Sequence, residues 1–139
     1  RARQRGERLE LQGRNLSGLG LFKANLSGAD LSGADLTQIN LASSDLAGVD
    51  LSHATLTAAE LTQACLNGAN LRQANLAQAN LVQVDLLDAD LSDTHLVGAD
   101  FGHADLTGAN LQAARYDEYT RWPLEFDPGA AGAVLMIST

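Results

Sequence analysis

The sequence predicts an all-β solenoid, in which the chain turns once in every five residues and stacks successive coils along one axis. Leucine stands at position 11 and at every fifth position up to 111, except that Phe101 replaces it once. A small residue, usually alanine, lies two places before each of these centres, and Asp or Asn usually lies one place before. Such a strict register indicates a repeated structural unit rather than a disordered low-complexity segment.

A five-residue spacing is inconsistent with a helix and with a continuous strand. Each residue of an α-helix advances by about 100°, so leucines five apart would be spread around the helix. Side chains of a strand alternate between its faces, so an odd spacing would place successive leucines on opposite sides. A chain that turns once per repeat can instead direct every leucine, and the residue two before it, into one interior. Turns of about 90° would close a coil after four repeats, with coils paired at about 4.8 Å.

Individual repeats resemble a known family. Residues 24–28 read Ala-Asn-Leu-Ser-Gly, residues 29–33 read Ala-Asp-Leu-Ser-Gly, and residues 109–111 read Ala-Asn-Leu. They resemble pentapeptide-repeat proteins, and the resemblance covers residues 9 to about 118. It implies a right-handed quadrilateral β-helix of about five coils; the handedness and the fourfold closure come from the resemblance and not from the spacing.

We expect residues 9–118 to form the β-helix, residues 1–8 to be a basic linker or a disordered arm, and residues 119–139 to form a C-terminal cap. The arm contains Arg1, Arg3, Arg5 and Arg8. Arg14 stands where a small interior residue is usual, and an unpaired guanidinium is costly to bury, so the first coil is expected to be frayed or capped.

An open solenoid end exposes core and unpaired backbone, so the tail is expected to cover the last coil. Residues 116–123 and 126–128 resemble the tails of cyanobacterial pentapeptide-repeat proteins. We expect Trp122, Leu124 and Phe126 to form a lid, with residues 130–137 packed behind it or frayed. Aromatic residues are also favoured at interfaces, so the cap could serve as a dimer or partner interface, leaving the chain a monomer or an end-to-end dimer. The cap or interface residues are Tyr116, Tyr119, Trp122 and Phe126.

The chain has no run of eighteen apolar residues and no secretory signal, so no membrane association is expected within it. It begins with Arg1 rather than Met, which indicates processing or a cut from a longer protein in which a signal or anchor could precede it. A cytoplasmic location is expected. The single cysteine, Cys65, excludes an internal disulfide.

Catalytic and metal sites need convergent side chains, and the register separates the candidates. His53, His95, His103 and Cys65 all occupy outward places of separate repeats, and the glycines fall at repeat corners rather than in a phosphate-binding loop. We therefore expect no catalytic residue, no metal, no cofactor and no enzymatic activity.

Charge is the feature with the most functional content. Residues 9–113 contain twelve acids and three bases, and the register places nine of these acids on two adjacent walls. The net charge of −8 opposes direct binding to nucleic acid. The function we expect is a non-catalytic interaction or structural module with an unidentified protein partner. The alternative, implied by the resemblance because some family members imitate duplex DNA, is a DNA mimic that binds DNA gyrase. Candidate partner-binding residues are Asp30, Asp45, Asp50, Asp85, Asp88, Asp90, Asp93 and Asp105.

Overall fold

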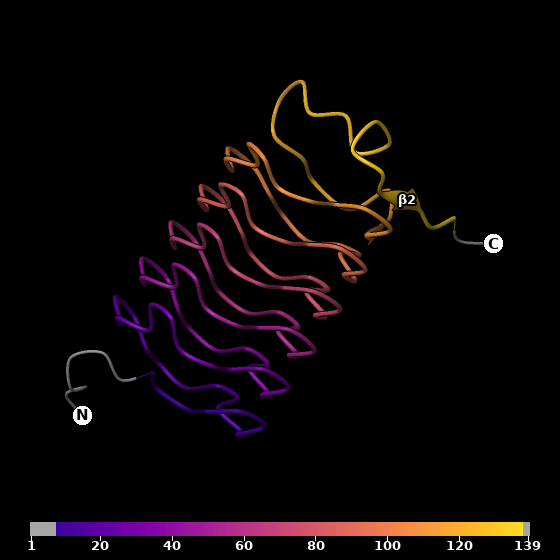
Figure 1. Cartoon of the computed structure of the whole chain (residues 1–139). Helices are drawn as coiled ribbons and strands as arrows, with labels where there is room; N and C mark the ends of the chain where they lie inside the picture. Colours follow the sequence, from indigo (N-terminus) through magenta and orange to yellow (C-terminus); the bar gives the residue numbers. More distant parts are fainter. Residues whose placement is uncertain (1–7, 138–139) are drawn as a thin grey trace.

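The computed structural model describes residues 8–137, which form a stack of coils running from the N-terminal to the C-terminal end (Figure 1). Parallel β-bridges join successive coils, and from Glu10↔Asp30 to His95↔Arg115 every bridge connects residues 20 apart. Twenty residues are four five-residue repeats, so each coil has four sides. The predicted quadrilateral β-helix is therefore the observed fold.

Four flat walls surround the interior, and we number them by the leucine or other residue at the centre of each repeat. Wall 1 has its centres at positions 11, 31, 51, 71, 91 and 111, wall 2 at 16, 36, 56, 76, 96 and 116, wall 3 at 21, 41, 61, 81 and 101, and wall 4 at 26, 46, 66, 86 and 106. Bridges between the residues that precede these centres hold each wall together, as in Asp30↔Asp50 on wall 1 and Asp45↔Cys65 on wall 4.

The chain turns immediately after each leucine. The second residue after the centre has a positive φ in every repeat from Gly13 (66°) to Ala113 (61°), and it is not glycine in most of them. The next residue closes the turn, as when the Ala34 N–H donates to the Leu31 carbonyl at 3.1 Å. This positive φ at the third residue of a closed four-residue turn is the arrangement of a type II turn.

The interior is a continuous column of aliphatic side chains. The leucines at the centres from 31 to 96 are buried, and so are the small residues two places before them. Ile39, Val49 and Val84 occupy small-residue places and are also fully buried, so the coil accommodates them. Two polar residues share the interior without leaving a hydroxyl unpaired: Ser44 donates to the Leu21 carbonyl at 3.0 Å and Thr94 to the Leu91 carbonyl at 2.7 Å.

The first coil was expected to be frayed or capped, and it is ordered rather than frayed. Its bridges Glu10↔Asp30 and Asn15↔Asp35 have the same register as those higher in the stack. Arg14 is exposed, which avoids burial of its charge. The centres Leu11, Leu16 and Leu21 are only partly buried, in contrast to later leucines. Of the expected basic arm, residues 1–7 lie outside the described part of the chain.

The last coil contains one extra residue. Asp100 pairs with Arg121, a separation of 21 rather than 20 residues. Trp122 then takes the place above Phe101, and the chain leaves the β-helix in a loop that stands beyond the last coil (Figure 1). It returns to place β2 (Val134–Leu135) parallel to β1 (Arg115–Tyr116), so residues 130–137 are not frayed. We call residues 117–137 the cap.

Candidate functional site

The carboxylates of the predicted acidic edge lie in columns on walls 1 and 4. On wall 4, Asp45 and Asp85 flank Cys65, and Asp105 continues the column above them. On wall 1, Asp30 pairs with Asp50, and the column continues through Asn70 to Asp90. The register therefore places these side chains as the sequence predicts. We call the following set the acidic edge: Asp30, Asp45, Asp50, Asp85, Asp88, Asp90, Asp93 and Asp105.

Most aspartates of these columns use one oxygen to hold the following turn. Oδ1 of Asp30 accepts hydrogen bonds from the Ser32 N–H (3.0 Å) and hydroxyl (2.7 Å). Asp50 and Asp90 accept the same pair from the serines two places on, and Asp105 accepts it from Thr107. The hydroxyl of Ser32 and then its backbone N–H hold the pKa of Asp30 below its usual range, and Thr107 acts in the same way on Asp105. Asp30 and Asp105 are consequently ionised at neutral pH. Each of the four aspartates has one oxygen committed to the turn.

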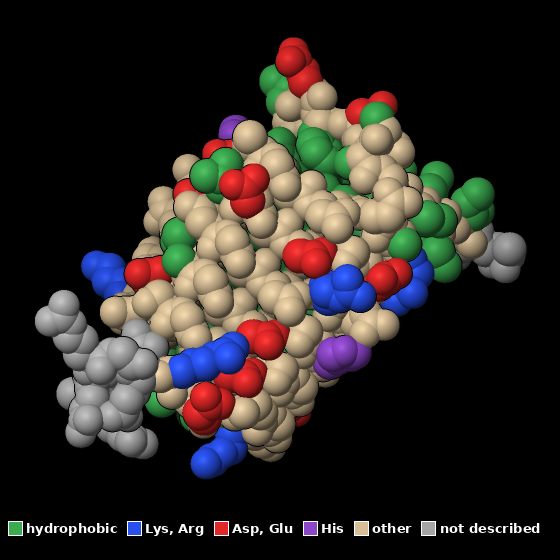
Figure 2. Space-filling model, viewed as in Figure 1, with side chains coloured by type: hydrophobic (Ala, Val, Ile, Leu, Met, Phe, Trp, Pro, Cys, Tyr) green, Lys and Arg blue, Asp and Glu red, His purple; other side chains and the backbone are tan. Residues whose placement is uncertain are grey.

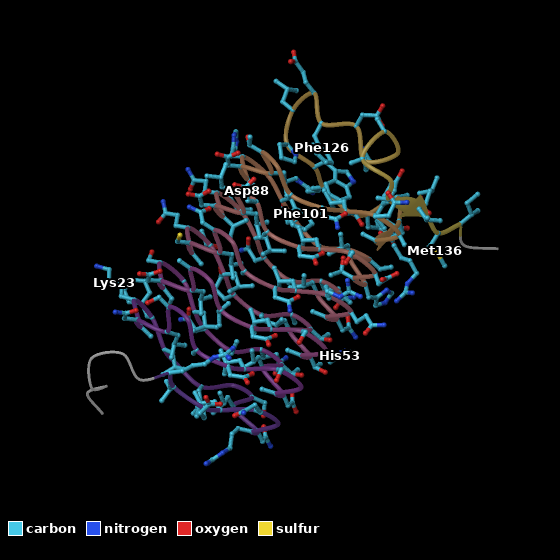
Figure 3. All side chains as sticks on the ribbon, viewed as in Figure 1. Lys23, His53, Asp88, Phe101, Phe126 and Met136 are labelled. Atoms are coloured by element: carbon cyan, nitrogen blue, oxygen red, sulfur yellow. The ribbon has the colours of Figure 1, made fainter. Side chains whose placement is uncertain are left out.

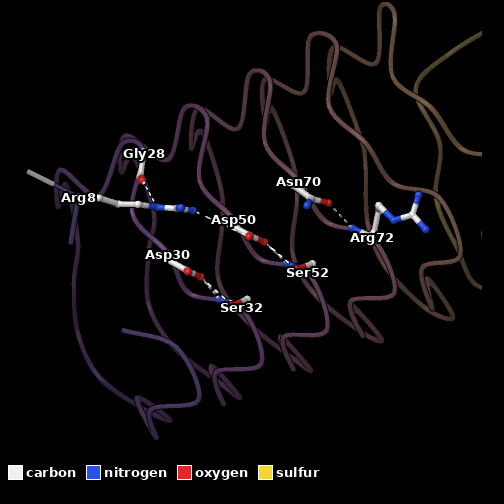
Figure 4. Close-up of polar contacts among 8 residues, drawn as sticks. All are labelled: Arg8, Gly28, Asp30, Ser32, Asp50, Ser52, Asn70 and Arg72. Carbon is white, nitrogen blue, oxygen red and sulfur yellow. Dashed lines mark hydrogen bonds and ion pairs between the residues drawn. The ribbon is translucent and has the colours of Figure 1, made fainter. Parts of the chain in front are cut away.

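Two arginines interrupt the negative charge of wall 1. The guanidinium of Arg8 donates to the Gly28 carbonyl at 3.1 Å and lies 3.9 Å from Asp50. Arg72 occupies the same wall in line with Ser32 and Ser52, in the column next to that of Asp30, Asp50 and Asn70 (Figure 4). Figure 2 shows basic and acidic side chains next to each other on the visible face. Wall 1 therefore carries both positive and negative charges in its N-terminal coils and is acidic only near Asp90.

The carboxylates are most frequent at residues 85–93, where the chain runs along wall 4 and then wall 1. Asp88 and Asp93 stand at the turn positions with φ of 57° and 58°, and Asp85 and Asp90 stand before the leucines. Asp85 differs from its neighbours, because its Oδ2 accepts from Asn67 Nδ2 at 3.0 Å whereas its Oδ1 is buried without a hydrogen-bond partner among the described residues. The Leu87 N–H, which would normally reach Asp85, donates to Asn67 Oδ1 at 2.9 Å.

The histidines and the cysteine do not converge. His53 lies at a turn of wall 1, His95 on wall 2, His103 at a turn of wall 3 and Cys65 on wall 4, between two carboxylates. Within residues 8–137 no group of three or more His, Cys, Asp or Glu side chains is arranged to hold a metal ion.

The cap is built on Trp122. Its ring stacks on Phe101 with centroids 5.0 Å apart and an interplanar angle of 2°, and on Phe126 at 5.2 Å, and Tyr116 approaches it edge-on at 5.5 Å. Figure 3 shows Phe101 and Phe126 together at the cap end of the stack. The prediction of a lid was wrong for Leu124, which is 94% exposed. Tyr119, predicted as a cap or interface residue, is 71% exposed and stands outside this aromatic cluster.

Sequence reasoning missed one pocket beside the cap. An open cavity of about 530 Å³ is lined by Val82, Asp100, Gly102, His103, Arg121 and Trp122. Asp100 already accepts the Gly102 N–H at 2.9 Å, and the remaining polar side-chain groups are the His103 imidazole, the Arg121 guanidinium and the Trp122 indole N–H. The extra residue before Arg121 brings these groups together, and the five-residue register gives no signal of that shift.

The chain is similar to known proteins in its sequence and in its fold. The family model for pentapeptide repeats (8 copies) matches in overlapping segments from residue 10 to residue 115. The chain belongs to the pentapeptide repeat family. Its β-helix is accordingly right-handed as well as four-sided. No curated protein sequence matched the chain.

The chain is similar to several solved pentapeptide repeat proteins, and the first of these has the same fold. One from the cyanobacterium Cyanothece 51142 is 30% identical, with a TM-score of 0.80, over 81% of this chain and 90% of that one. Another, from Nostoc PCC 7120, is 32% identical, with a TM-score of 0.41, over 93% of this chain and 86% of that one. The plasmid-mediated fluoroquinolone resistance protein QnrB1 is 18% identical, with a TM-score of 0.31, over 91% of this chain and 79% of that one. In the described part of the chain, no helix has the length and apolarity to cross a bilayer.

Proposed function

We propose that this pentapeptide repeat protein is a non-catalytic interaction module that binds a basic surface of a protein partner through the acidic edge. The supporting observation is that hydrogen bonds from the following turn fix the carboxylates in one orientation. Asp90 Oδ1 is fixed by the Ser92 N–H (3.0 Å) and hydroxyl (2.7 Å), so the direction of its second oxygen is set by the backbone. Carboxylates arranged in this way lose little conformational freedom when a cationic group binds.

The packed interior supports an external binding surface. Leu51, Leu71 and Leu91 are fully buried, and alanines fill the places beside them. The described histidines and Cys65 lie on different walls, so no nucleophile, base and orienting group meet. Binding on the outside of a rigid column is the use that this arrangement favours.

A charge-neutralising variant tests the proposal without disturbing the turns. Asp88→Asn, Asp90→Asn and Asp93→Asn together remove three charges from the acidic edge, and asparagine keeps the Oδ1 acceptor that position 90 uses. The matched control changes three acids on walls 2 and 3: Asp35→Asn, Glu60→Gln and Asp100→Asn. In affinity capture from native cell extract, the control is expected to retain the partner of the unmodified protein and the edge variant to lose it. Equal capture by both variants would refute the edge as the binding surface.

The second candidate, a DNA mimic that binds DNA gyrase, draws its support from the placement of nine of the twelve acids of residues 9–113 on walls 1 and 4. Duplex DNA carries one charge per about 1.7 Å of its axis. Carboxylates of one column here are at least one coil apart, which is about 4.8 Å, so the charge density of the acidic edge matches that of DNA only in part. Arg8 and Arg72 reduce it further on wall 1. We expect purified protein to leave supercoiling by gyrase unchanged. Inhibition that is lost in the edge variant and kept in the control would favour the DNA mimic instead.

A further inference from the structure

The two ends of the stack differ in shape. At the C-terminal end, the loop of the cap projects beyond the last coil, and its tip is a turn in which the Phe126 N–H donates to the Pro123 carbonyl at 3.1 Å. Leu124 and Glu125 form this tip, and Leu124 is 94% exposed. Because Phe126 stacks on Trp122 at 5.2 Å, the tip is anchored to the packed aromatic cluster. We call Leu124 and Glu125 the knob.

At the opposite end, described residues of the first coil expose apolar side chains. The first-coil centres Leu11, Leu16 and Leu21 are only partly buried, and Leu19 and Phe22 are 45% and 57% exposed. By contrast, Leu31 and the centres above it up to position 96 are almost completely shielded from solvent. Exposed apolar side chains gathered at one end of the stack are typical of an interaction site.

The ends also differ in charge. Lys23 and Arg14 belong to the first coil, and neither lies within ion-pair distance of a carboxylate among the described residues. Figure 3 shows Lys23 at the end of the stack opposite Phe126. Around the knob the charge is mostly negative, from Asp117, Glu118, Glu125 and Asp127 against the single base Arg121. An apolar knob with an acidic surround therefore stands at one end, and exposed apolar side chains with basic residues stand at the other.

We propose that copies of this chain associate head to tail, with the Leu124–Glu125 knob of one copy seated on the first coil of the next. Leu124 packs against the apolar surface that includes Leu19 and Phe22, and Glu125 faces Lys23. A second copy is the occupant because an exposed apolar tip with acidic neighbours and an exposed apolar surface with basic residues are on the same chain. The contact is heterologous, so it leaves a free knob and a free first coil on every assembly and does not close at a dimer.

Analytical ultracentrifugation of residues 1–139 over a wide concentration range tests the proposal. The weight-average mass of the unmodified chain is expected to rise steadily past that of a dimer. It is expected to fall when salt is added, because exposed charges are screened beyond about 8 Å at physiological ionic strength. A chain that stays monomeric at millimolar concentration, or one that stops at a closed dimer, would overturn the proposal.

Two single substitutions block one end each. Phe22→Asp places a charge on the first coil, and Leu124→Asp places one on the knob; each variant alone is expected to be monomeric. An equimolar mixture is expected to form a 1:1 dimer and nothing larger, because only one functional knob and one functional first coil remain between the two variants. Leu87→Asp, which changes an exposed apolar residue on wall 4, is the control and is expected to assemble like the unmodified chain. Failure of the mixture to dimerise, or loss of assembly in the control, would refute the assignment of the two surfaces.

The charge pairing has its own test. Lys23→Glu and Glu125→Lys are each expected to weaken assembly, and the double variant is expected to restore it. If the double variant associates no more strongly than the single variant that associates least, Glu125 does not face Lys23.

Discussion

Residues in front of the leucines act on the backbone. Asp30 and Asp105 accept both the N–H and the hydroxyl of the residue two places on, which explains why Asp and Asn are so frequent there. The outward direction of these side chains follows from the sequence by register alone. Their role as turn acceptors does not follow from periodicity, because it depends on the positive φ at the next corner, such as 67° at Gly33.

Gly33 and Gly20 offer a matched test of that corner. A Cβ added at either glycine meets nothing within 4 Å, but only Gly33 has a positive φ. Gly33→Ala is expected to lower the free energy of unfolding by about 1 kcal/mol, because an L-residue is disfavoured in this conformation. Gly20→Ala is expected to leave stability unchanged or to raise it by about 0.4–1 kcal/mol. Urea unfolding measures both, and equal effects would contradict the role of the positive φ.

Asp117 predicts a pH dependence. Burial raises the pKa of Asp117, but hydrogen bonds from Gly98, Tyr119 and Thr120 outweigh it, so the pKa lies below its ordinary value of 3.8. A carboxyl with a lowered folded-state pKa stabilises the fold above its ordinary pKa and loses this contribution as pH falls through the folded value. Asp117→Asn keeps the accepting Oδ1 without the charge.

Denaturant unfolding at a series of pH values gives the comparison. The unmodified protein is expected to be more stable than the Asp117→Asn variant at neutral pH, with the difference disappearing below pH 3.8. A difference that stays constant with pH would show that the charge of Asp117 contributes nothing.

At the scale of elements, the cap is the part of the chain that the five-residue spacing does not describe. The sequence places an aromatic cap after the repeats, and Tyr116, Trp122 and Phe126 do pack together. The exposure of Leu124 and Tyr119 could not be predicted, because the register shifts by one residue before Arg121. Phe101 could have indicated where the cap packs. It is the aromatic residue in the leucine column, and Trp122 stacks on it.

The Phe101–Trp122 pair predicts non-additive stability. Phe101→Leu and Trp122→Leu each remove the parallel stack at 5.0 Å, so the double variant should lose less than the sum of the two single variants. The expected coupling free energy is about 0.5–1.5 kcal/mol, which is typical of aromatic pairs. Thermal or urea unfolding of the four proteins completes the cycle. A coupling of zero would mean that Trp122 stabilises the last coil by area alone.

For the whole molecule, the leucine spacing predicts a chain that turns once per repeat, since every repeat must turn to bury its leucine, whereas the four-sided closure was expected only from the family resemblance. The separation of 20 residues between bridged positions confirms four turns per coil. The functional surface is less determined by sequence. The register gives the wall of each charge, but the contact of Arg8 with Asp50 depends on a long flexible side chain that no periodic pattern specifies.

The burial of the leucine column is tested most directly by unfolding of a Leu71→Asp variant against a Gln73→Asp control. Leu71 is fully buried, whereas Gln73 is exposed at a turn position where Asp93 stands one coil above. Leu71→Ala should lower the free energy of unfolding by about 2–5 kcal/mol, and Leu71→Asp should abolish the cooperative transition, because a charge would enter the core. Gln73→Asp should unfold like the unmodified chain. Cooperative unfolding of Leu71→Asp with the stability of that control would contradict an interior leucine column.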